Sequence, residues 1–357
     1  MTQSSVTTQM PRQAAAGERA RDNRGPLLEV EDLRTWFYLR HGVLKAVDGL
    51  GFSLAAGETL AVVGESGCGK SVSALSLMRL VPNPPGKTVG GSIKLAGVDL
   101  LRLSEREMRA VRGREISMIF QEPMTSLNPV MRIGDQIAEA VLLHDSVGRS
   151  DALRRALDIL GLVRMPAAKQ RLSEYPHQLS GGMRQRAMIA MALACNPKVL
   201  IADEPTTALD VTIQAQILDL IVDLQRKLGT AVILITHDLG VVAETAQRVI
   251  VMYAGRKVEE AAVGELFVRP LHPYTRGLLE SVPRLGSMRG EVAVRRRLKE
   301  IPGIVPPLTN LPAGCAFAPR CALADDKCRG LFPAYEEKRP QHWVACWHSD
   351  APEAANG

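Results

Sequence analysis

The chain has 357 residues, a formal charge of +6, 46% hydrophobic residues and 4% aromatic residues. This length indicates a large core domain with an extension rather than one small domain. No stretch offers the roughly 18 consecutive apolar residues of a membrane-spanning helix, and residues 1–25 lack the apolar region of a secretory signal. We therefore expect a cytoplasmic protein with a disordered tail over residues 1–26. A solvated surface explains the mild positive charge, and no nucleic-acid partner is expected.

The first half of the chain predicts strands that are followed by helices. Residues 27–63 alternate between apolar and polar side chains and end in an apolar run, which is typical of several strands that end in a buried one. A glycine-rich turn and a helix over residues 71–80 follow. The next predicted elements are strands at 91–95 and 115–120, two helices over 133–163 separated at Gly148, and a helix at 183–194.

The second half alternates strands and helices until a proline-rich region begins. Buried strands are predicted at residues 199–202 and 231–236, on either side of an amphipathic helix over 213–228, and a hairpin is predicted over 248–258. This alternation indicates an α/β fold whose mainly parallel sheet is covered on both faces. Prolines become frequent after residue 266, and they mark residues 267–357 as a separate, irregular extension.

A phosphate-binding pattern, G-x-x-x-x-G-K-[ST], occurs where the chain reads GESGCGKS. It follows a predicted buried strand and opens a helix, so backbone N–H groups and the helix dipole can bind an anion. Lys70 would neutralise the β- and γ-phosphates of a nucleotide, and the Ser71 hydroxyl would bind Mg²⁺. The residues expected to bind ATP in this loop are Gly64, Glu65, Ser66, Gly67, Cys68, Gly69, Lys70, Ser71 and Val72.

Two carboxylates follow the predicted strand at residues 199–202. Asp203 is placed to hold Mg²⁺ through water. Glu204 is the candidate general base that polarises an attacking water molecule. Strand ends often carry acidic side chains as surface or capping groups, but that alternative has little weight beside a phosphate loop.

Further along, the residues LSGGMRQ at positions 179–185 complete a set of motifs that resembles the ABC transporter ATPase family. They are similar to the family's LSGGQ signature, with Met183 in the usual glutamine position. The resemblance implies that Ser180, Gly181 and Gly182 bind a phosphate through a hydroxyl and backbone N–H groups at a helix start. Met183 removes one side-chain donor, but these other contacts are expected to preserve activity.

Other residues resemble family motifs by their order along the chain. Gln121 follows a predicted strand like the Q-loop glutamine, which also contacts Mg²⁺. Asp210 is similar to the D-loop aspartate, and His237 ends a strand like the switch histidine. The family also stacks an upstream aromatic residue on adenine, and by position we favour Phe37 for this role, with Tyr38 next.

This resemblance covers about residues 27–262 and implies a P-loop NTPase. The expected ABC nucleotide-binding domain, residues 27–266, has a RecA-like core, an antiparallel β subdomain and an α-helical subdomain at about residues 122–180. Two such domains face each other head to tail in this family, so the chain is expected to dimerise with itself or with a related subunit. The segment 122–129 lies where the family docks a membrane subunit. Catalysis is then expected from Lys70, Gln121, Glu204 and His237.

Cys68 departs from the family's pattern, which usually has a small polar residue at this loop position. A thiol here could be oxidised or alkylated, and either change would crowd the phosphate site.

The extension narrows the resemblance to the ATPases of dipeptide and oligopeptide permeases. It contains LHPYTR at residues 271–276, and SLNP at residues 126–129 also fits this group. Such ATPases work in pairs with two integral membrane permease subunits and an extracytoplasmic peptide-binding protein, at the cytoplasmic face of the inner membrane. Some relatives handle nickel or glutathione instead. A soluble ABC ATPase of DNA repair or translation is disfavoured, because the chain has one cassette and this extension.

Four cysteines in the extension suggest a metal site. They are separated by five, six and seventeen residues, which is not the paired C-x-x-C spacing of a zinc ribbon. Four thiolates without close pairing can hold a [4Fe–4S] cluster, as in some of the permease ATPases that the chain resembles. Zn²⁺ and unliganded thiols are the alternatives, and His342 and His348 are more simply surface histidines than ligands. The expected cluster ligands are Cys315, Cys321, Cys328 and Cys346.

Overall fold

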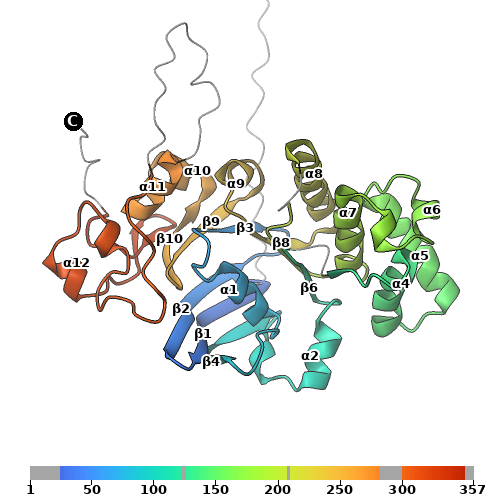
Figure 1. Ribbon diagram of the computed structural model, residues 1–357, viewed down its shortest axis with the longest axis horizontal. Coiled ribbons are helices and arrows are strands. Elements are labelled where there is room, and N and C mark those ends of the chain that lie inside the picture. Colours follow the sequence, from blue (N-terminus) through green and yellow to red (C-terminus); the bar gives the residue numbers. More distant parts are fainter. Residues whose placement is uncertain (1–24, 122–125, 207–209, 282–299, 350–357) are drawn as a thin grey trace, which may run out of the picture.

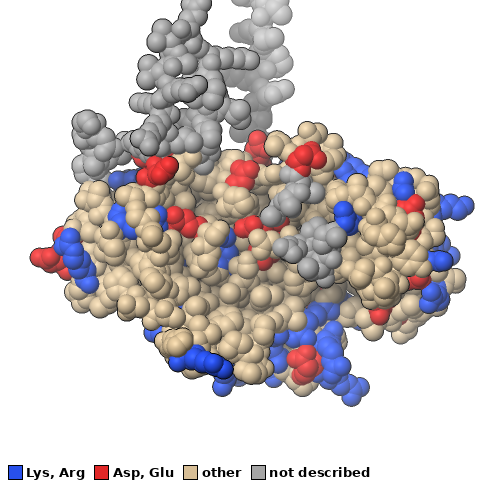
Figure 2. Space-filling view, viewed as in Figure 1, with Lys and Arg blue, Asp and Glu red and all other residues tan. Residues whose placement is uncertain are grey.

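The computed structural model describes residues 25–121, 126–206, 210–281 and 300–349. In this mixed α/β structure, a central sheet separates a helical lobe from the C-terminal extension, and a second sheet lies to one side (Figure 1). Among the described helices, none is long and apolar enough to cross a membrane. Basic and acidic side chains are interspersed on the face shown in Figure 2, as expected for a solvated surface. Nearly all of the tail expected at residues 1–26 lies outside the described residues.

Within the described residues the central sheet has eight strands in the order β11-β12-β10-β9-β3-β8-β7-β6. Neighbours from β9 to β6 pair in parallel, whereas β10, β12 and β11 add antiparallel strands at one edge. The strands are β3 (Thr59–Val63), β6 (Ile116–Ile119), β7 (Val199–Asp203), β8 (Ala231–Ile235), β9 (Arg248–Tyr253), β10 (Arg256–Ala262), β11 (Glu336–Arg339) and β12 (His342–Val344). Every residue of β3, β7 and β8 is buried, as their apolar runs predicted.

The second sheet is antiparallel and has the strand order β2-β1-β4-β5 within the described residues. Its strands are β1 (Leu28–Leu39), β2 (Gly42–Leu54), β4 (Gly86–Leu95) and β5 (Val98–Asp99). The strand predicted at residues 91–95 is therefore the end of a longer strand. This sheet corresponds to the expected antiparallel β subdomain.

Helices cover both faces of the central sheet. They are α1 (Lys70–Leu77), α2 (Glu105–Val111), α4 (Ile133–His144), α5 (Arg149–Leu162), α6 (Ala168–Arg171), α7 (Gly181–Ala192), α8 (Val211–Leu228) and α9 (Leu239–Thr245), with short 3-10 turns at Leu100–Arg102, Pro176–Gln178 and Ala318–Arg320. As predicted, the helical stretch after residue 133 is broken at Gly148, which is the N-cap of α5. Gly229 ends α8 with a left-handed φ of +68°, where glycine is favoured.

Alternate residues of β7 face two different hydrophobic cores. Leu200 and Ala202 pack in a core with α4, α5, α7 and α8, whereas Val199 and Ile201 pack in a core with α1 and the second sheet. The first core builds the helical lobe, α4 to α7. The sheet therefore has apolar contacts on both faces, which confirms the expected layered α/β architecture.

The extension is joined to the central sheet by two of its own strands, a contribution that its prolines did not predict. It also contains α11 (Pro273–Glu280) and α12 (Asp326–Gly330), and α10 (Val263–Val268) leads into it. Strand β12 pairs with β10, and β11 pairs with β12 at the edge of the sheet.

A fully buried contact between Glu259 and His342 fixes this junction. Glu259 of β10 accepts hydrogen bonds from the N–H groups of Leu271 (2.7 Å) and His272 (3.0 Å), and its Oε1 lies 2.7 Å from His342 Nε2. The expectation that His342 is a surface histidine is therefore wrong, because its side chain is completely buried against this carboxylate. A buried carboxylate needs such partners to offset its lost hydration.

Candidate active site

The phosphate loop connects β3 to α1, and two glycines allow it to contact neighbouring backbone. Gly64 has a φ of +150° and Gly69 a φ of +105°, a region that L side chains rarely adopt. A Cβ atom at Gly64 would lie 2.3 Å from the carbonyl oxygen of Met252, and one at Gly69 would lie 2.2 Å from that of Ala46. The shape of the loop therefore requires glycine at both positions.

Lys70 lies at the start of α1 and bonds back to the loop. Its Nζ donates to the carbonyl oxygens of Gly64 (2.8 Å) and Glu65 (3.0 Å), and the residue is buried. The ammonium group is thus fixed at a helix N-terminus, where the helix dipole also attracts an anion. This arrangement suits the phosphate groups of a nucleotide.

The two side chains expected to hold Mg²⁺ contact each other. Ser71 Oγ donates to Asp203 Oδ1 at 3.0 Å, from the first turn of α1 to the end of β7. Burial raises the pKa of the Asp203 carboxyl, and the hydrogen bond from Ser71 acts in the opposite direction. A hydroxyl and a carboxylate are oxygen ligands of the kind that Mg²⁺ prefers.

Glu204 lies between two side chains that the sequence assigned to separate motifs. Its Oε2 accepts a hydrogen bond from Gln121 Nε2 at 3.0 Å, and its Oε1 lies 3.4 Å from His237 Nδ1. The three residues follow the ends of the adjacent parallel strands β6, β7 and β8. A carboxylate held by an amide donor and an imidazole can orient and polarise a water molecule.

A cavity of about 510 Å³ connects these groups with the predicted adenine-binding residue. Tyr38, the second choice for adenine, does not line it and is 51% exposed. The predicted site residues that line the cavity are Phe37, Ser66, Gly67, Gly69, Lys70, Ser71, Val72, Gln121 and Glu204.

Other cavity residues were not identified from the sequence, namely Leu39, Leu44, Ala46 and Leu308. Leu39 and Leu44 lie on either side of the turn between β1 and β2. Their closeness in sequence to Phe37, the predicted adenine-binding residue, could have identified them as cavity residues. No sequence signal points to Leu308, which comes from the C-terminal extension.

The signature residues lie outside this cavity. Ser180 caps α7 by accepting a hydrogen bond from the N–H of Met183 at 3.4 Å, and Gly181 and Gly182 form the first turn. Asp210 likewise caps α8 and does not line the cavity. A single chain therefore does not bring its signature to its own phosphate loop at this cavity.

Cys68 is shielded rather than reactive. The residue is completely buried, and Lys70 Nζ lies 3.8 Å from its Sγ. Burial raises the pKa of the thiol, so the nucleophilic thiolate is disfavoured. The expectation that this thiol is open to alkylation or oxidation is not supported by its surroundings.

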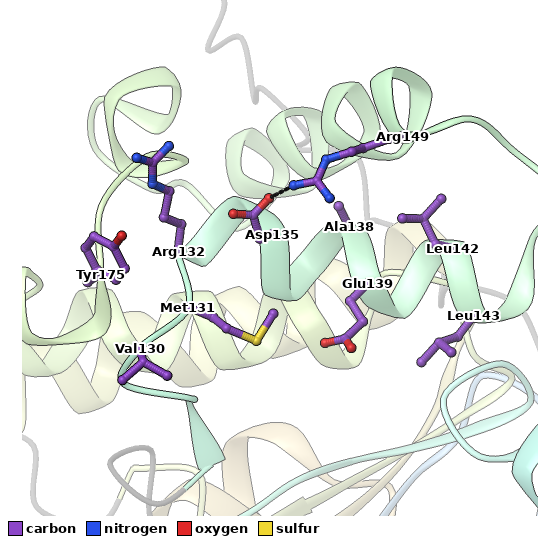
Figure 3. A pocket seen from close by; sticks show the side chains of 10 residues that line it. All are labelled: Val130, Met131, Arg132, Asp135, Ala138, Glu139, Leu142, Leu143, Arg149 and Tyr175. Carbon is purple, nitrogen blue, oxygen red and sulfur yellow. Dashed lines mark hydrogen bonds and ion pairs between the residues drawn. The ribbon is translucent and has the colours of Figure 1, made fainter.

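A groove of about 530 Å³ runs along α4 in the helical lobe, close in sequence to the segment expected to dock a membrane subunit (Figure 3). Two of its apolar side chains are largely exposed, with Val130 at 79% and Leu143 at 74%. An Arg149–Asp135 ion pair of 2.7 Å lies beside them. Exposed apolar groups beside charged ones are typical of interaction surfaces. Of the expected docking segment, residues 122–125 lie outside the described residues.

The four cysteines of the extension line one small cavity, together with His272 and Phe317. Burial raises the pKa of each of these thiols. His272 Nδ1 accepts a hydrogen bond from the N–H of Tyr274 at 3.0 Å, so the proton of its neutral ring is on Nε2. That Nε2 is buried and has no partner among the described residues. An unpaired N–H donor and four cysteine sulfur atoms therefore line the same cavity.

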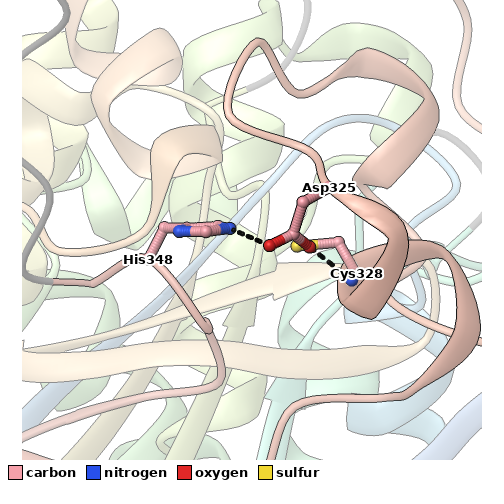
Figure 4. A group of neighbouring side chains, drawn as sticks. All are labelled: Asp325, Cys328 and His348. Atoms are coloured by element: carbon pink, nitrogen blue, oxygen red, sulfur yellow. Dashed lines mark hydrogen bonds and ion pairs between the residues drawn. The ribbon is translucent and has the colours of Figure 1, made fainter.

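Figure 4 shows a second potential metal-binding group at the edge of this cavity. Asp325 accepts a hydrogen bond from the N–H of Cys328 at 2.8 Å, and its other oxygen lies 3.1 Å from His348 Nε2. The His348 side chain is 31% exposed, so it lies only partly at the surface, where we expected it. Asp325 was not identified from the sequence, although an acid close to a cysteine motif is a signal for a ligand.

Known sequences match both the nucleotide-binding part and the C-terminal extension of this chain. The family described as ABC transporter matches residues 47–207, and the family described as oligopeptide/dipeptide transporter, C-terminal region, matches residues 258–328. The probable peptide ABC transporter ATP-binding protein y4tR of Sinorhizobium fredii is 60% identical over 91% of this chain and 95% of its own length. This chain belongs to the family of ATP-binding subunits of dipeptide and oligopeptide ABC transporters. The oligopeptide transport ATP-binding protein AppD of Bacillus subtilis is 54% identical over 90% of this chain and 96% of its own length.

Solved structures of ABC ATPase cassettes show the same fold. One is a dimeric ATP-binding cassette in a post-hydrolysis state with ADP and Pi, with a TM-score of 0.60 and 25% identity over 66% of this chain and 98% of that chain. Another, part of an ABC transporter complex of Clostridium perfringens, has a TM-score of 0.58 and 26% identity over 68% of this chain and 91% of that chain. The fold is therefore the P-loop NTPase fold of ABC ATPases, and the chain is an ATPase.

Proposed function

We propose that this chain binds ATP with Mg²⁺ and hydrolyses it to power the import of dipeptides or oligopeptides through a membrane ABC transporter. The observation that carries the proposal is the meeting of Lys70, Gln121 and Glu204 in one cavity. The two family matches, one to the cassette and one to the peptide-transporter extension, support the coupling of that ATPase to peptide transport.

The residues in and next to the cavity take different steps in this proposal. Lys70 and the loop N–H groups bind the phosphates, and Phe37 stacks on adenine. Ser71, Asp203 and Gln121 would hold Mg²⁺, which supplies charge neutralisation when bound. Glu204 accepts a proton from the attacking water, while Gln121 and His237 fix the position of its carboxylate.

The signature requires a second cassette. Ser180, Gly181, Gly182 and Asp210 lie outside the cavity of their own chain, so they are available to a facing nucleotide site. The dimeric cassette among the similar structures supports a pair of cassettes. We propose that the partner is a related ABC ATPase subunit or a second copy of this chain.

The groove along α4 is the proposed contact for the membrane permease subunits. Its exposed Val130 and Leu143 would be covered by an apolar element of a permease subunit. The chain would then sit peripherally at the cytoplasmic face of the inner membrane, with two permease subunits and an extracytoplasmic peptide-binding protein that supplies the substrate.

The four-cysteine cavity is proposed to hold a [4Fe–4S] cluster rather than Zn²⁺. Burial disfavours the thiolate form of the four cysteines that line this cavity, and a cationic metal centre would offset the cost of ionising them. Asp325 and His348 already pair with each other, which leaves the four sulfur atoms as the natural ligand set. When bound, an iron–sulfur group supplies a cross-link between the segments that carry Cys315, Cys321, Cys328 and Cys346. His272 Nε2 would donate a hydrogen bond to its sulfur atoms.

Uptake in the native host tests the transport function. A strain that lacks the gene would carry the wild-type chain, Glu204→Gln or Glu244→Gln. Glu244→Gln is the control, because Glu244 is an exposed residue of α9 that does not line the cavity. We expect Glu204→Gln alone to abolish uptake of a labelled dipeptide or of a longer labelled peptide, while nickel uptake stays intact. Equal peptide uptake by all three strains would contradict the proposal, and selective loss of nickel uptake would favour a metal transporter.

A further inference from the structure

The phosphate loop and the C-terminal extension are joined by a partly buried ion pair. Arg320 Nη1 and Nη2 donate to the two carboxylate oxygens of Glu65, at 2.6 and 3.0 Å. Glu65 is the second residue of the phosphate loop, and Arg320 lies 255 positions later in the chain. Only 3% of the Arg320 side chain is exposed, whereas 29% of the Glu65 side chain is, so water reaches this two-point contact from the Glu65 side only.

Every N–H donor of the Arg320 guanidinium has a partner. Besides the two bonds to Glu65, Nε donates to the Pro302 carbonyl at 2.9 Å, Nη2 to the Ile301 carbonyl at 3.3 Å, and Nη1 to Tyr253 Oη at 3.4 Å. The guanidinium therefore cannot shift without breaking several bonds. Its fork is fixed in the orientation that holds the Glu65 carboxylate.

Tyr274 holds the same loop residue through the backbone. The N–H of Glu65 donates to Tyr274 Oη at 2.8 Å, and Tyr274 is completely buried. Its ring is packed by Tyr253 and Phe317, at centroid distances of 4.7 and 5.5 Å. Two residues of the extension thus hold the carboxylate and the N–H of Glu65, while the Glu65 carbonyl accepts a hydrogen bond from Lys70.

A third residue of the extension reaches the cavity itself. Leu308 lines it together with Phe37, Leu39 and Leu44. These apolar side chains form the end of the cavity that is suited to a nucleobase, whereas Lys70 and the loop form the phosphate end.

We propose that the C-terminal extension is part of the ATP site. Arg320 and Tyr274 are positioning residues that hold the phosphate loop through Glu65, and Leu308 contacts the base of the nucleotide. The inference rests on the proposed function, because it requires ATP to occupy this cavity. A loop without these contacts would sample other conformations, and ATP binding would then have to bear the cost of ordering it.

The test is the ATP dependence of hydrolysis by the assembled transporter, with tripolyphosphate as a competitor that can use only the phosphate end. Arg320→Met should raise the KM for ATP about tenfold and Tyr274→Phe about threefold, with kcat within about twofold of wild type. Both variants should weaken inhibition by tripolyphosphate by the same factors. Leu308→Ala should raise the KM for ATP about threefold and leave tripolyphosphate inhibition unchanged.

Arg102→Met is the matched control. Arg102 forms an ion pair of 3.1 Å with Asp99, but its side chain is 88% exposed, so the pair should contribute little. Its KM should equal that of wild type. A purely structural role for Arg320 would lower the active fraction, and with it kcat, at an unchanged KM, and that result would overturn the proposal. If the Arg320→Met variant does not assemble into the transporter, the Tyr274→Phe variant provides the test. An unchanged KM for ATP in that variant would again overturn the proposal. A wild-type complex that hydrolyses no ATP would contradict the proposed function instead.

Discussion

The phosphate loop and the C-terminal extension contribute to one cavity by different physical means. The loop depends on backbone contacts that leave no room for a Cβ atom at Gly64 or Gly69. The extension depends on side-chain pairs that span the chain, such as Arg320 with Glu65 and His342 with Glu259. The local loop therefore fixes where a phosphate binds, whereas distant side chains hold that loop in shape.

The largest effect is expected where the backbone contact is closest. Gly69→Ala would place a Cβ atom 2.2 Å from the Ala46 carbonyl oxygen, so the loop must move and ATP binding should weaken by about 100-fold or more. Gly97→Ala is the control, since Gly97 has a similar φ of +83° but no atom within 4 Å of a Cβ. Binding of a fluorescent ATP analogue to both variants measures the difference. Equal affinities would show that backbone crowding does not shape the site.

In the extension, the iron content of the protein should depend on Cys346. Cys346 lies beyond the part of the extension that matches the peptide-transporter family, yet it lines the four-cysteine cavity. Cys346→Ser should reduce the iron content from about four atoms per chain to below one. Cys195→Ser, which changes a half-buried thiol in the helical lobe, should leave the iron content unchanged. Iron and zinc analysis of anaerobically purified protein checks this, and full iron retention in Cys346→Ser would contradict a four-cysteine cluster.

The smallest effect concerns the cost of burying Asp203. Because burial raises the pKa of this carboxyl, its ionised form destabilises the folded, nucleotide-free protein at neutral pH. Asp203→Asn should therefore raise the melting temperature at pH 7 by about 2–4 °C, while it weakens Mg²⁺-dependent ATP binding. The gain in melting temperature should shrink as the pH falls towards 3.8, the ordinary pKa of the group. A lower melting temperature for the variant at pH 7 would contradict this account.

The sequence predicts the elements that are fixed by local chemistry. The buried strands β3, β7 and β8, the helix break at Gly148 and the order of the catalytic motifs follow from apolar runs, glycines and spacing. The contacts among Gln121, Glu204 and His237 were not predicted, because they depend on the order of the strands β6, β7 and β8 in the sheet.

Contacts across long stretches of chain could not be predicted in the same way. Nothing near Arg320 or Leu308 identifies Glu65 or the cavity as their neighbour, because the path of a proline-rich extension is set by tertiary packing. The burial of His342 is a similar case, since it depends on the pairing of β12 with β10. Side-chain type alone pointed to the surface for that residue.

We propose that ATP hydrolysis at Glu204 in this chain drives peptide import. The most direct test measures ATP turnover and labelled-peptide uptake in the same proteoliposomes, which contain the complete transporter and either wild-type chain or Glu204→Gln. The account predicts that Glu204→Gln retains ATP binding, loses ATP turnover by about 10²–10³-fold and loses uptake by the same factor. Peptide uptake that continues while ATP turnover is lost would contradict the account.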